Sequence, residues 1–148
     1  MKKKLYLAGA MGCYGNDIKK ANEWRNRVLT YIELSPYNKE NIRCFNPASY
    51  YNYSEQIHKT EQEIMRFDFN QLKNSDIVLV NLKDIDKSIG TSDEVLFSYL
   101  HGLPVIGFYE DSDNINFVHP WKIEQMDRIE TGKDALKNVI DYILEYYS

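Results

Sequence analysis

The sequence of 148 residues contains only two cysteines, and they stand far apart. Cys13 and Cys44 form no Cys-x-x-Cys pair, so neither a disulfide framework nor a zinc site is indicated, and a reducing, cytoplasmic location is expected. The basic residues are scattered apart from Lys2-Lys3-Lys4, and the formal net charge is -4. This pattern argues against nucleic acid and anionic membranes as partners and favours a small, nearly neutral ligand.

The chain also lacks a long apolar run. The first one, Leu5–Ala10, is too short for a signal peptide, and no other stretch approaches the length of a membrane span. The length suits one domain with a core of its own, so we expect a single domain over residues 1–148. We expect it to be soluble and to need neither a metal ion nor another cofactor.

Short apolar runs alternate with segments of helical periodicity along the whole chain. Strands are predicted at residues 4–9, 43–45, 77–80 and 105–108, with a last one near 128–129. Helices are predicted from about residue 21 to a stop at Ser35-Pro36, and over residues 55–73, 91–102 and 135–147. The alternation predicts an α/β fold of the Rossmann or flavodoxin-like, doubly wound type. Right-handed crossovers then favour a parallel sheet of order 2-1-3-4-5.

The loop after the first predicted strand is rich in glycine. Its sequence, Gly9–Gly15, is neither G-x-G-x-x-G nor a Walker loop, so a dinucleotide or triphosphate cradle is not indicated. We interpret it as a permissive ligand-binding loop.

Glu94 is the most informative carboxylate of the chain. It follows the apolar run 77–80 and so lies beyond the carboxyl end of a buried strand, where open α/β sheets bind their ligands. The spacing Thr91-x-x-Glu94 also fits a capping box, with Thr91 as the N-cap and Glu94 at position N3. The two interpretations are compatible, because a helix N-terminus would keep Glu94 ionised.

Asp68 falls on the apolar stripe of the predicted helix 55–73, which consists of Ile57, Ile64, Met65 and Leu72. A buried carboxylate is costly unless it is paired or used, so a catalytic role is one interpretation. The alternative is that the helix rolls and exposes both Asp68 and Glu61 at its rim.

Several blocks of the sequence, taken in order, resemble the nucleoside 2-deoxyribosyltransferase family. The first block is Leu5-Tyr6-Leu7-Ala8-Gly9, and the second leads from Asp68 through Leu72 to Ser75-Asp76. The third is Gly90-Thr91-x-x-Glu94 with Gly102-x-Pro104-Val105-Ile106, and a weaker fourth is Ile115-Asn116-Phe117 followed by Trp121. The resemblance extends over residues 4–121. The order and spacing of the blocks, rather than any single one, make it specific.

The resemblance implies transfer of 2-deoxyribose between nucleobases, with retention of configuration at the anomeric carbon. Glu94 would attack C1′ to form a covalent glycosyl enzyme, Asp68 would protonate the leaving base, and Tyr6 would hydrogen-bond and orient Glu94. A second base would intercept this intermediate in a transferase, and water would do so in a hydrolase. An ionised carboxylate suits an oxocarbenium-like transition state, and a nucleobase leaves well only when protonated.

The resemblance places five further residues in the substrate site: Gly9, Met11, Ser88, Gly90 and Asn116. At the position of Ser88 the deoxyribosyltransferases usually have aspartate, whereas related deoxynucleoside 5′-monophosphate N-glycosidases have a serine that binds the phosphate. Those hydrolases also have an arginine in the first loop, and Gly9–Asn16 contains none. A phosphate dianion would therefore lack its usual partner. We expect an uncharged nucleoside, with the monophosphate hydrolase as the alternative.

Asn116 matches the family's asparagine that contacts the sugar 5′-hydroxyl from a neighbouring subunit. A homo-oligomer, a dimer or larger, is therefore implied. Aromatic residues that could contact the base or another subunit are Tyr50, Tyr51, Tyr53 and Trp121. A more remote alternative is a non-catalytic flavodoxin-like module that senses a nucleotide derivative.

Overall fold

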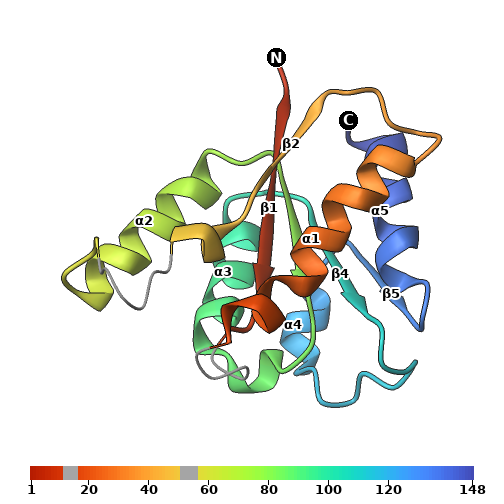
Figure 1. Cartoon of the computed structure of the whole chain (residues 1–148). Helices are drawn as coiled ribbons and strands as arrows, with labels where there is room; N and C mark the ends of the chain where they lie inside the picture. The colour runs from red at the N-terminus through yellow and green to blue at the C-terminus, as the bar shows by residue number, and fades with distance from the viewer. Residues whose placement is uncertain (12–16, 51–56) are drawn as a thin grey trace.

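The computed structural model describes residues 1–11, 17–50 and 57–148. In it, five parallel strands form one sheet in the order β2-β1-β3-β4-β5 (Figure 1). The strands are β1 (Lys3–Gly9), β2 (Ile42–Phe45), β3 (Ile77–Asn81), β4 (Val105–Tyr109) and β5 (Arg128–Thr131). The predicted fold class and strand order are confirmed, and this is the order that right-handed crossovers produce.

Helices cover both faces of the sheet. Helices α1 and α5 pack on one face, and α2 and α3 lie on the other (Figure 1). The helical segments of the described residues are α1 (Ile18–Leu34), η2 (Pro47–Tyr50), α2 (Glu61–Lys73), η3 (Ile85–Lys87), α3 (Ile89–Leu100), α4 (Pro120–Glu124) and α5 (Ala135–Tyr146). None of these helices is both long enough and apolar enough to cross a membrane.

Alternation along β1 distributes its side chains between the two faces. Leu5 and Leu7 pack against α1 and α5, whereas Tyr6 and Ala8 belong to the cluster beneath α2 and α3. All four side chains are buried. Both faces of β1 are therefore covered by apolar groups. On the face beneath α2 and α3, the strand also contributes the hydroxyl group of Tyr6.

Helix α2 begins later than the sequence pattern predicts. The prediction placed its start near residue 55, but the helix begins at Glu61 with Thr60 as the N-cap. Thr60 Oγ1 accepts a hydrogen bond from the Glu63 amide at 3.2 Å, and the Glu63 carboxylate accepts one from the Thr60 amide at 2.9 Å. This reciprocal capping box satisfies the free amides of the first turn, so it determines where the helix starts.

Helix α3 begins earlier than predicted, and its cap is a different residue. Its N-cap is Ser88, whose Oγ accepts a hydrogen bond from the Thr91 amide at 3.3 Å. Glu94 is therefore the sixth residue of the helix and lies in its second turn. The predicted capping box with Thr91 and Glu94 is wrong, because Ser88 performs that function three residues earlier.

The segment around β4 contains one confirmed boundary and one helix that was missed. The predicted stop of α3 at Gly102 is confirmed, with a φ of +71° and an amide that donates to the Tyr99 carbonyl at 3.1 Å. Between β4 and β5 lies α4, with Pro120 in its first turn and His119 Nδ1 accepting from the Trp121 amide at 3.1 Å. Five residues are too few to show a helical period, so the pattern did not predict it.

Candidate active site

A cavity of about 580 Å³ lies where β1 ends, between α2 and the first turns of α3. This is the carboxyl edge of the parallel sheet, at which open α/β folds bind their ligands. The lining residues come from the end of β1, from η2, from one side of α2 and from the start of α3. They are Gly9, Met11, Pro47, Glu61, Gln62, Ile64, Met65, Asp68, Phe69, Ser88, Ile89, Gly90, Thr91, Asp93 and Glu94.

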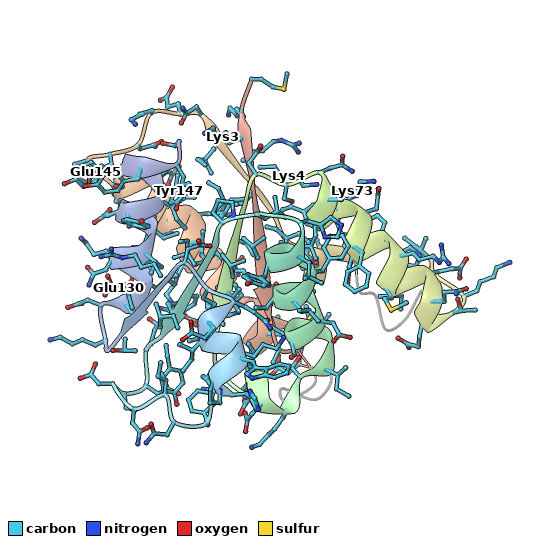
Figure 2. All side chains as sticks on the ribbon, turned by 180° about the vertical axis from the view of Figure 1, so that it is seen from behind. Lys3, Lys4, Lys73, Glu130, Glu145 and Tyr147 are labelled. Atoms are coloured by element: carbon cyan, nitrogen blue, oxygen red, sulfur yellow. The ribbon has the colours of Figure 1, made fainter. Side chains whose placement is uncertain are left out.

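Helix α2 forms one wall because only its last turns are held against the sheet. Leu72 is its one buried residue, and Lys4 of β1 donates from Nζ to Gln71 Oε1 at 2.5 Å. Figure 2 shows Lys4 beside the end of α2 marked by Lys73, while the other end of the helix extends away from the sheet. The space beneath that free end is part of the cavity.

The predicted apolar stripe of α2 is therefore only partly core. Leu72 is buried, but Met65 is 47% exposed and Ile57, which precedes the helix, is 78% exposed. Ile64 and Met65 line the cavity instead. Asp68 lies on this same side and is half-buried, so the helix brings it to the cavity rather than into the core.

Tyr6 joins the sheet to the catalytic candidate on α3. Its ring is fully buried and stacks on Phe45 with 5.4 Å between the ring centroids. Its hydroxyl donates a hydrogen bond to Glu94 Oε2, as the resemblance implied. Because Tyr6 lies in β1 between β2 and β3, this bond ties Glu94 to the middle of the sheet.

The surroundings of Glu94 raise its pKa to about 8. Burial is the largest cause, because it disfavours the charged form, and the negative charges of Asp68 and Asp93 act in the same direction. The hydrogen bond from Tyr6 and the positive charge of Arg25 oppose the increase. Glu94 lies in the second turn of α3, beyond the first turn in which the helix dipole acts most strongly, so burial is the main influence on its pKa.

Four of the five predicted substrate-site residues lie at this cavity, namely Gly9, Met11, Ser88 and Gly90. Asn116 does not. It is exposed and lines a neighbouring cavity of about 640 Å³ that contains residues of α4. The two cavities share three lining residues, Ser88, Ile89 and Asp93. Within one chain, Asn116 and Glu94 thus line different cavities.

The comparisons with known proteins identify the family of the chain. The family model described as nucleoside 2-deoxyribosyltransferase matches residues 5–138. The chain belongs to this family. It is therefore an enzyme of the deoxyribosyltransferase and N-glycosidase group. Among curated protein sequences, the comparison finds no match.

Solved structures of this enzyme group share the fold. The 2-deoxyribosyltransferase of Bacillus psychrosaccharolyticus is 19% identical, with a TM-score of 0.63 over 98% of this chain and 92% of that one. The 2-desoxiribosyltransferase of Leishmania mexicana is 14% identical, with a TM-score of 0.65 over 99% of both chains. A CMP N-glycosidase of Clostridium botulinum is 10% identical, with a TM-score of 0.61 over 95% of this chain and 98% of that one. At these identities the similarity establishes the fold alone.

The Ser88 side chain is hydrogen-bonded within the protein, and no atom lies close to the position that a side chain of residue 90 would occupy. In addition to capping α3, Ser88 Oγ donates to Thr91 Oγ1 at 2.8 Å. A Cβ added at Gly90 would meet no atom within 4 Å. At the start of α3 in this deoxyribosyltransferase-family chain, the Ser88 hydroxyl is therefore already hydrogen-bonded within the protein, and the backbone at Gly90 borders open space.

The aromatic residues predicted to contact the base or a subunit do not form one group. Tyr50 stacks on Phe45 at 5.4 Å, and Trp121 is 75% exposed on α4. Neither is among the described residues that line the cavity. Tyr51 and Tyr53 lie outside the described residues, and so do residues 12–16 of the glycine-rich loop.

The sequence reasoning missed the apolar part of the wall. Pro47 lies two residues after the end of β2, at the same edge of the sheet as Gly9, and Phe69 follows Asp68 on α2. The break at Asn46-Pro47 was visible in the sequence and could have pointed to Pro47, because carboxyl ends of parallel strands share an edge. Phe69 gave no such signal, since it lies outside the regular apolar stripe.

The cavity lining is acidic. It contains four carboxylates, Glu61, Asp68, Asp93 and Glu94, and no lysine or arginine among the described residues. Residues 12–16 add neither a lysine nor an arginine in sequence. The described residues contain no group of three or more His, Cys, Asp or Glu that could hold a metal ion. The lining thus brings together several carboxyl groups from two helices, and one of them, Glu94, is held by a tyrosine.

Proposed function

We propose that this enzyme transfers 2-deoxyribose from one nucleobase to another through a covalent intermediate on Glu94. One observation carries the proposal. Glu94 on α3 accepts a hydrogen bond from Tyr6 and shares its cavity with a second carboxylate, Asp68, which comes from a different helix. A retaining displacement needs such a pair, with one carboxylate as nucleophile and the other as proton donor.

In the first step, a carboxylate oxygen of Glu94 forms a bond to C1′ while the bond from C1′ to the base breaks. The base takes the bonding electron pair and receives the proton of Asp68, so it leaves as a neutral molecule. In the second step, a different base attacks C1′, releases Glu94 as a carboxylate and returns a proton to Asp68. Two displacements at the same carbon retain the β configuration.

In this mechanism the two carboxyl groups share one proton. The negative charge of Asp68 is among the causes that raise the pKa of Glu94, and this contribution disappears when Asp68 is protonated. The singly protonated pair with the proton on Asp68 therefore has an ionised nucleophile and a neutral acid. The Tyr6 hydroxyl further favours this arrangement because it donates to the Glu94 carboxylate.

The size and the apolar wall of the cavity fit a nucleoside. Pockets for small molecules are commonly about 300–1,000 Å³, and this one is about 580 Å³. Ile64, Met65 and Phe69 provide an apolar surface on α2 for the face of a base. Since the bases are flat and similar in thickness, one such surface can accept the leaving base and then the incoming one.

The charges favour a nucleoside over its 5′-monophosphate. A phosphate dianion would enter a lining with four carboxylates and, in the described residues, no cation. Ser88 alone offers it a hydroxyl, and that hydroxyl is already bonded to Thr91. Removing a dianion from water without a cationic partner costs more than one hydrogen bond returns. Ser88 remains the one observation that favours hydrolysis of a monophosphate as a second candidate function.

Asn116 completes the site of a neighbouring subunit in this proposal. It is exposed and lies in a different cavity from Glu94 of its own chain. Two large apolar side chains near it are also exposed: Ile89, which lines the same cavity as Asn116, at 80%, and Trp121 of α4, next to the lining residue Pro120, at 75%. Such residues favour contact with a second copy of the chain. Mixing a Glu94→Gln chain with an Asn116→Ala chain should restore part of the activity if the site is shared.

The decisive experiment mixes a 2′-deoxynucleoside, or its 5′-monophosphate, with a different free base and follows all four species by chromatography. We expect exchange of the base on the nucleoside and little turnover of the monophosphate. Glu94→Gln should lower the rate by several orders of magnitude, whereas Glu124→Gln, an exposed glutamate on α4, is the matched control. Turnover of the monophosphate alone, with release of sugar phosphate, would replace this proposal by the hydrolase. Binding without any release of base would indicate a sensor.

A further inference from the structure

Strand β1 extends beyond its neighbour β2. The register pairs Lys3–Tyr6 with Ile42–Phe45, so the last part of β1 has no partner on that side. The carbonyls of Leu7 and Gly9 point to the β2 side, because the backbone of Lys4 bonds on the β3 side and alternate residues bond to opposite sides. These two carbonyls, which lie next to the cavity, thus receive no hydrogen bond from a strand on that side.

A proline prevents β2 from supplying the next donor. If the register of Leu5 with Cys44 continued, the amide of residue 47 would donate to the Leu7 carbonyl. Residue 47 is Pro47, which has no amide hydrogen, and the chain turns there into η2. A buried carbonyl without a donor is costly, so another group must satisfy it.

Arg25 of α1 supplies these donors. Its Nε donates to the Leu7 carbonyl at 3.4 Å, and its Nη2 donates to the Gly9 carbonyl at 3.2 Å. Its Nη1 donates to the Ala21 carbonyl of its own helix at 2.7 Å. The side chain is only 2% exposed. The planar fork of the guanidinium suits this task, because one group reaches two carbonyls two residues apart along the strand.

The segment that Arg25 holds is part of the cavity. Gly9 and Met11 are among its lining residues, and Tyr6 comes three residues before Gly9 on the same strand. Behind Gly9 lies Trp24, whose ring carbon Cζ2 would be 2.9 Å from a Cβ at position 9. Arg25 and Trp24 therefore support the end of β1 from the face of the sheet opposite to the cavity.

Arg25 also brings a permanent positive charge toward the carboxylates. Burial raises the pKa of Glu94, and the hydrogen bond from Tyr6 and the charge of Arg25 lower it. Asp68 on α2 and Asp93 on α3 are the charged groups that raise it. On α4, Lys122 donates from Nζ to the Ser92 carbonyl and to Gln125 Oε1, and it is not among the charges that shift the pKa of Glu94. Arg25 is thus the charged group that favours an ionised Glu94.

We propose that Arg25 is a positioning residue of the active site, with two separable roles. Its hydrogen bonds hold the end of β1, which lines the cavity, and its charge offsets the negative charge of the carboxylates. The inference rests on the proposed function for its kinetic part. It extends that function to a residue on the far face of the sheet, which the mechanism itself does not use.

Two substitutions separate the two roles. Arg25→Lys keeps the charge but cannot reach both carbonyls with a planar fork, whereas Arg25→Gln keeps one donor group and removes the charge. Arg27→Gln is the matched control, because Arg27 lies one half-turn away on α1, pairs with Glu110 at 2.7 and 2.6 Å and does not line the cavity. The folded state of each variant is checked by circular dichroism and size-exclusion chromatography.

The readouts are kcat and KM for base exchange as a function of pH, and the NMR titration of the Glu94 carboxyl carbon in glutamate-labelled protein. For Arg25→Gln we expect kcat at pH 7 to fall between about 10-fold and 100-fold and the Glu94 titration to move up by roughly one pH unit. For Arg25→Lys we expect a lower kcat with the titration in place. Arg27→Gln should change neither.

Three results would overturn the proposal. The first is a folded Arg25→Gln with unchanged kcat and unchanged titration of Glu94. The second is an equal change in Arg27→Gln, which would make the effect a general one of α1. The third is failure of both Arg25 variants to fold while Arg27→Gln folds, which would leave Arg25 a purely structural residue. If the wild-type chain exchanges no base, the proposed function fails, and the Glu94 titration still tests the charge of Arg25.

Discussion

Helices α5 and α2 have nearly the same length but bury very different amounts of their surface. Of the twelve residues of α5, six are buried, whereas Leu72 is the single buried residue among the thirteen of α2. Helix α5 lies along the sheet beside α1, while only the C-terminal turns of α2 lie close to the sheet and its N-terminal part extends away from it (Figure 1). The same kind of periodic sequence thus builds the core on one face and the wall of a cavity on the other.

The difference follows from what interrupts the apolar side of each helix. In α5 the apolar positions Leu136, Val139, Ile140 and Ile143 are continuous and meet a sheet face of leucine and isoleucine. In α2 the corresponding side carries Asp68. Burying that carboxylate in a closed core would cost several kcal/mol. Because most of the helix stands away from the sheet, Asp68 remains accessible to water and to a ligand. The helix in return buries less apolar surface than α5.

The largest effect is expected at Asp68 itself. Asp68→Asn should lower kcat by about 10²- to 10⁴-fold, because the amide cannot donate a proton with comparable ease. The loss should be greatest for nucleosides whose base leaves poorly. Steady-state kinetics on a series of leaving bases measures this, with Asp134→Asn at the start of α5 as the control. Equal slowing for good and poor leaving groups would mean that Asp68 only positions the substrate.

The two helices should respond differently to truncation of an apolar side chain. Ile140→Ala in α5 should lower the free energy of unfolding by about 2–5 kcal/mol, because Ile140 is fully buried. Met65→Ala in α2 should cost less than about 1 kcal/mol and instead raise KM, since Met65 lines the cavity. Urea denaturation and steady-state kinetics measure the two quantities. A large loss of stability in Met65→Ala would contradict the description of α2 as a cavity wall.

Glu94 should make the stability of the protein depend on pH. Its pKa is raised from 4.5 to about 8, so the folded state binds the proton more tightly than the unfolded state. The stabilisation is fully present below the unfolded pKa and is lost as pH rises through the folded one. Relative to wild type, Glu94→Gln should therefore gain stability between about pH 5 and pH 8, by up to roughly 1.4 kcal/mol per pH unit.

The measurement is urea denaturation of both proteins at several pH values, with Glu145→Gln on the exposed side of α5 as the baseline variant. A difference between Glu94→Gln and wild type that stays constant from pH 5 to pH 8 would mean that burial does not perturb Glu94 in solution.

The smallest effect is expected at Gly90. Its added Cβ meets no atom within 4 Å, so Gly90→Ala should fold and gain up to about 1 kcal/mol from the higher helix propensity of alanine. If the substrate occupies that space, KM should rise. Thermal denaturation and kinetics provide the two readouts. In contrast, Gly107→Ala would place a Cβ 2.7 Å from Met126 Sδ, so the Met126 side chain would have to move.

Much of the fold was predictable because its signals are local. Apolar runs at period two and stripes at helical period identified the five strands and the four longer helices, and chain connectivity then determined the strand order. The cavity could also be anticipated, since Gly9 and Glu94 both follow strands whose carboxyl ends meet at one edge. The first residues of the helices were harder to predict. Ser88, Thr60 and Thr91 can all act as N-caps, and the sequence alone does not show which of them does so.

By itself, the sequence determined the parallel sheet and predicted a ligand site at its carboxyl edge, and its resemblance to a known family suggested Glu94 and Asp68 as the catalytic pair. Only the tertiary structure decided that α2 stands away from the sheet, that Glu94 lies in the second turn of α3 and that Asn116 lines a separate cavity. It also brought Arg25 to the end of β1. The physical reason is that strand and helix periods are properties of neighbouring residues, whereas burial, charge and missing ladder donors depend on which distant segments meet.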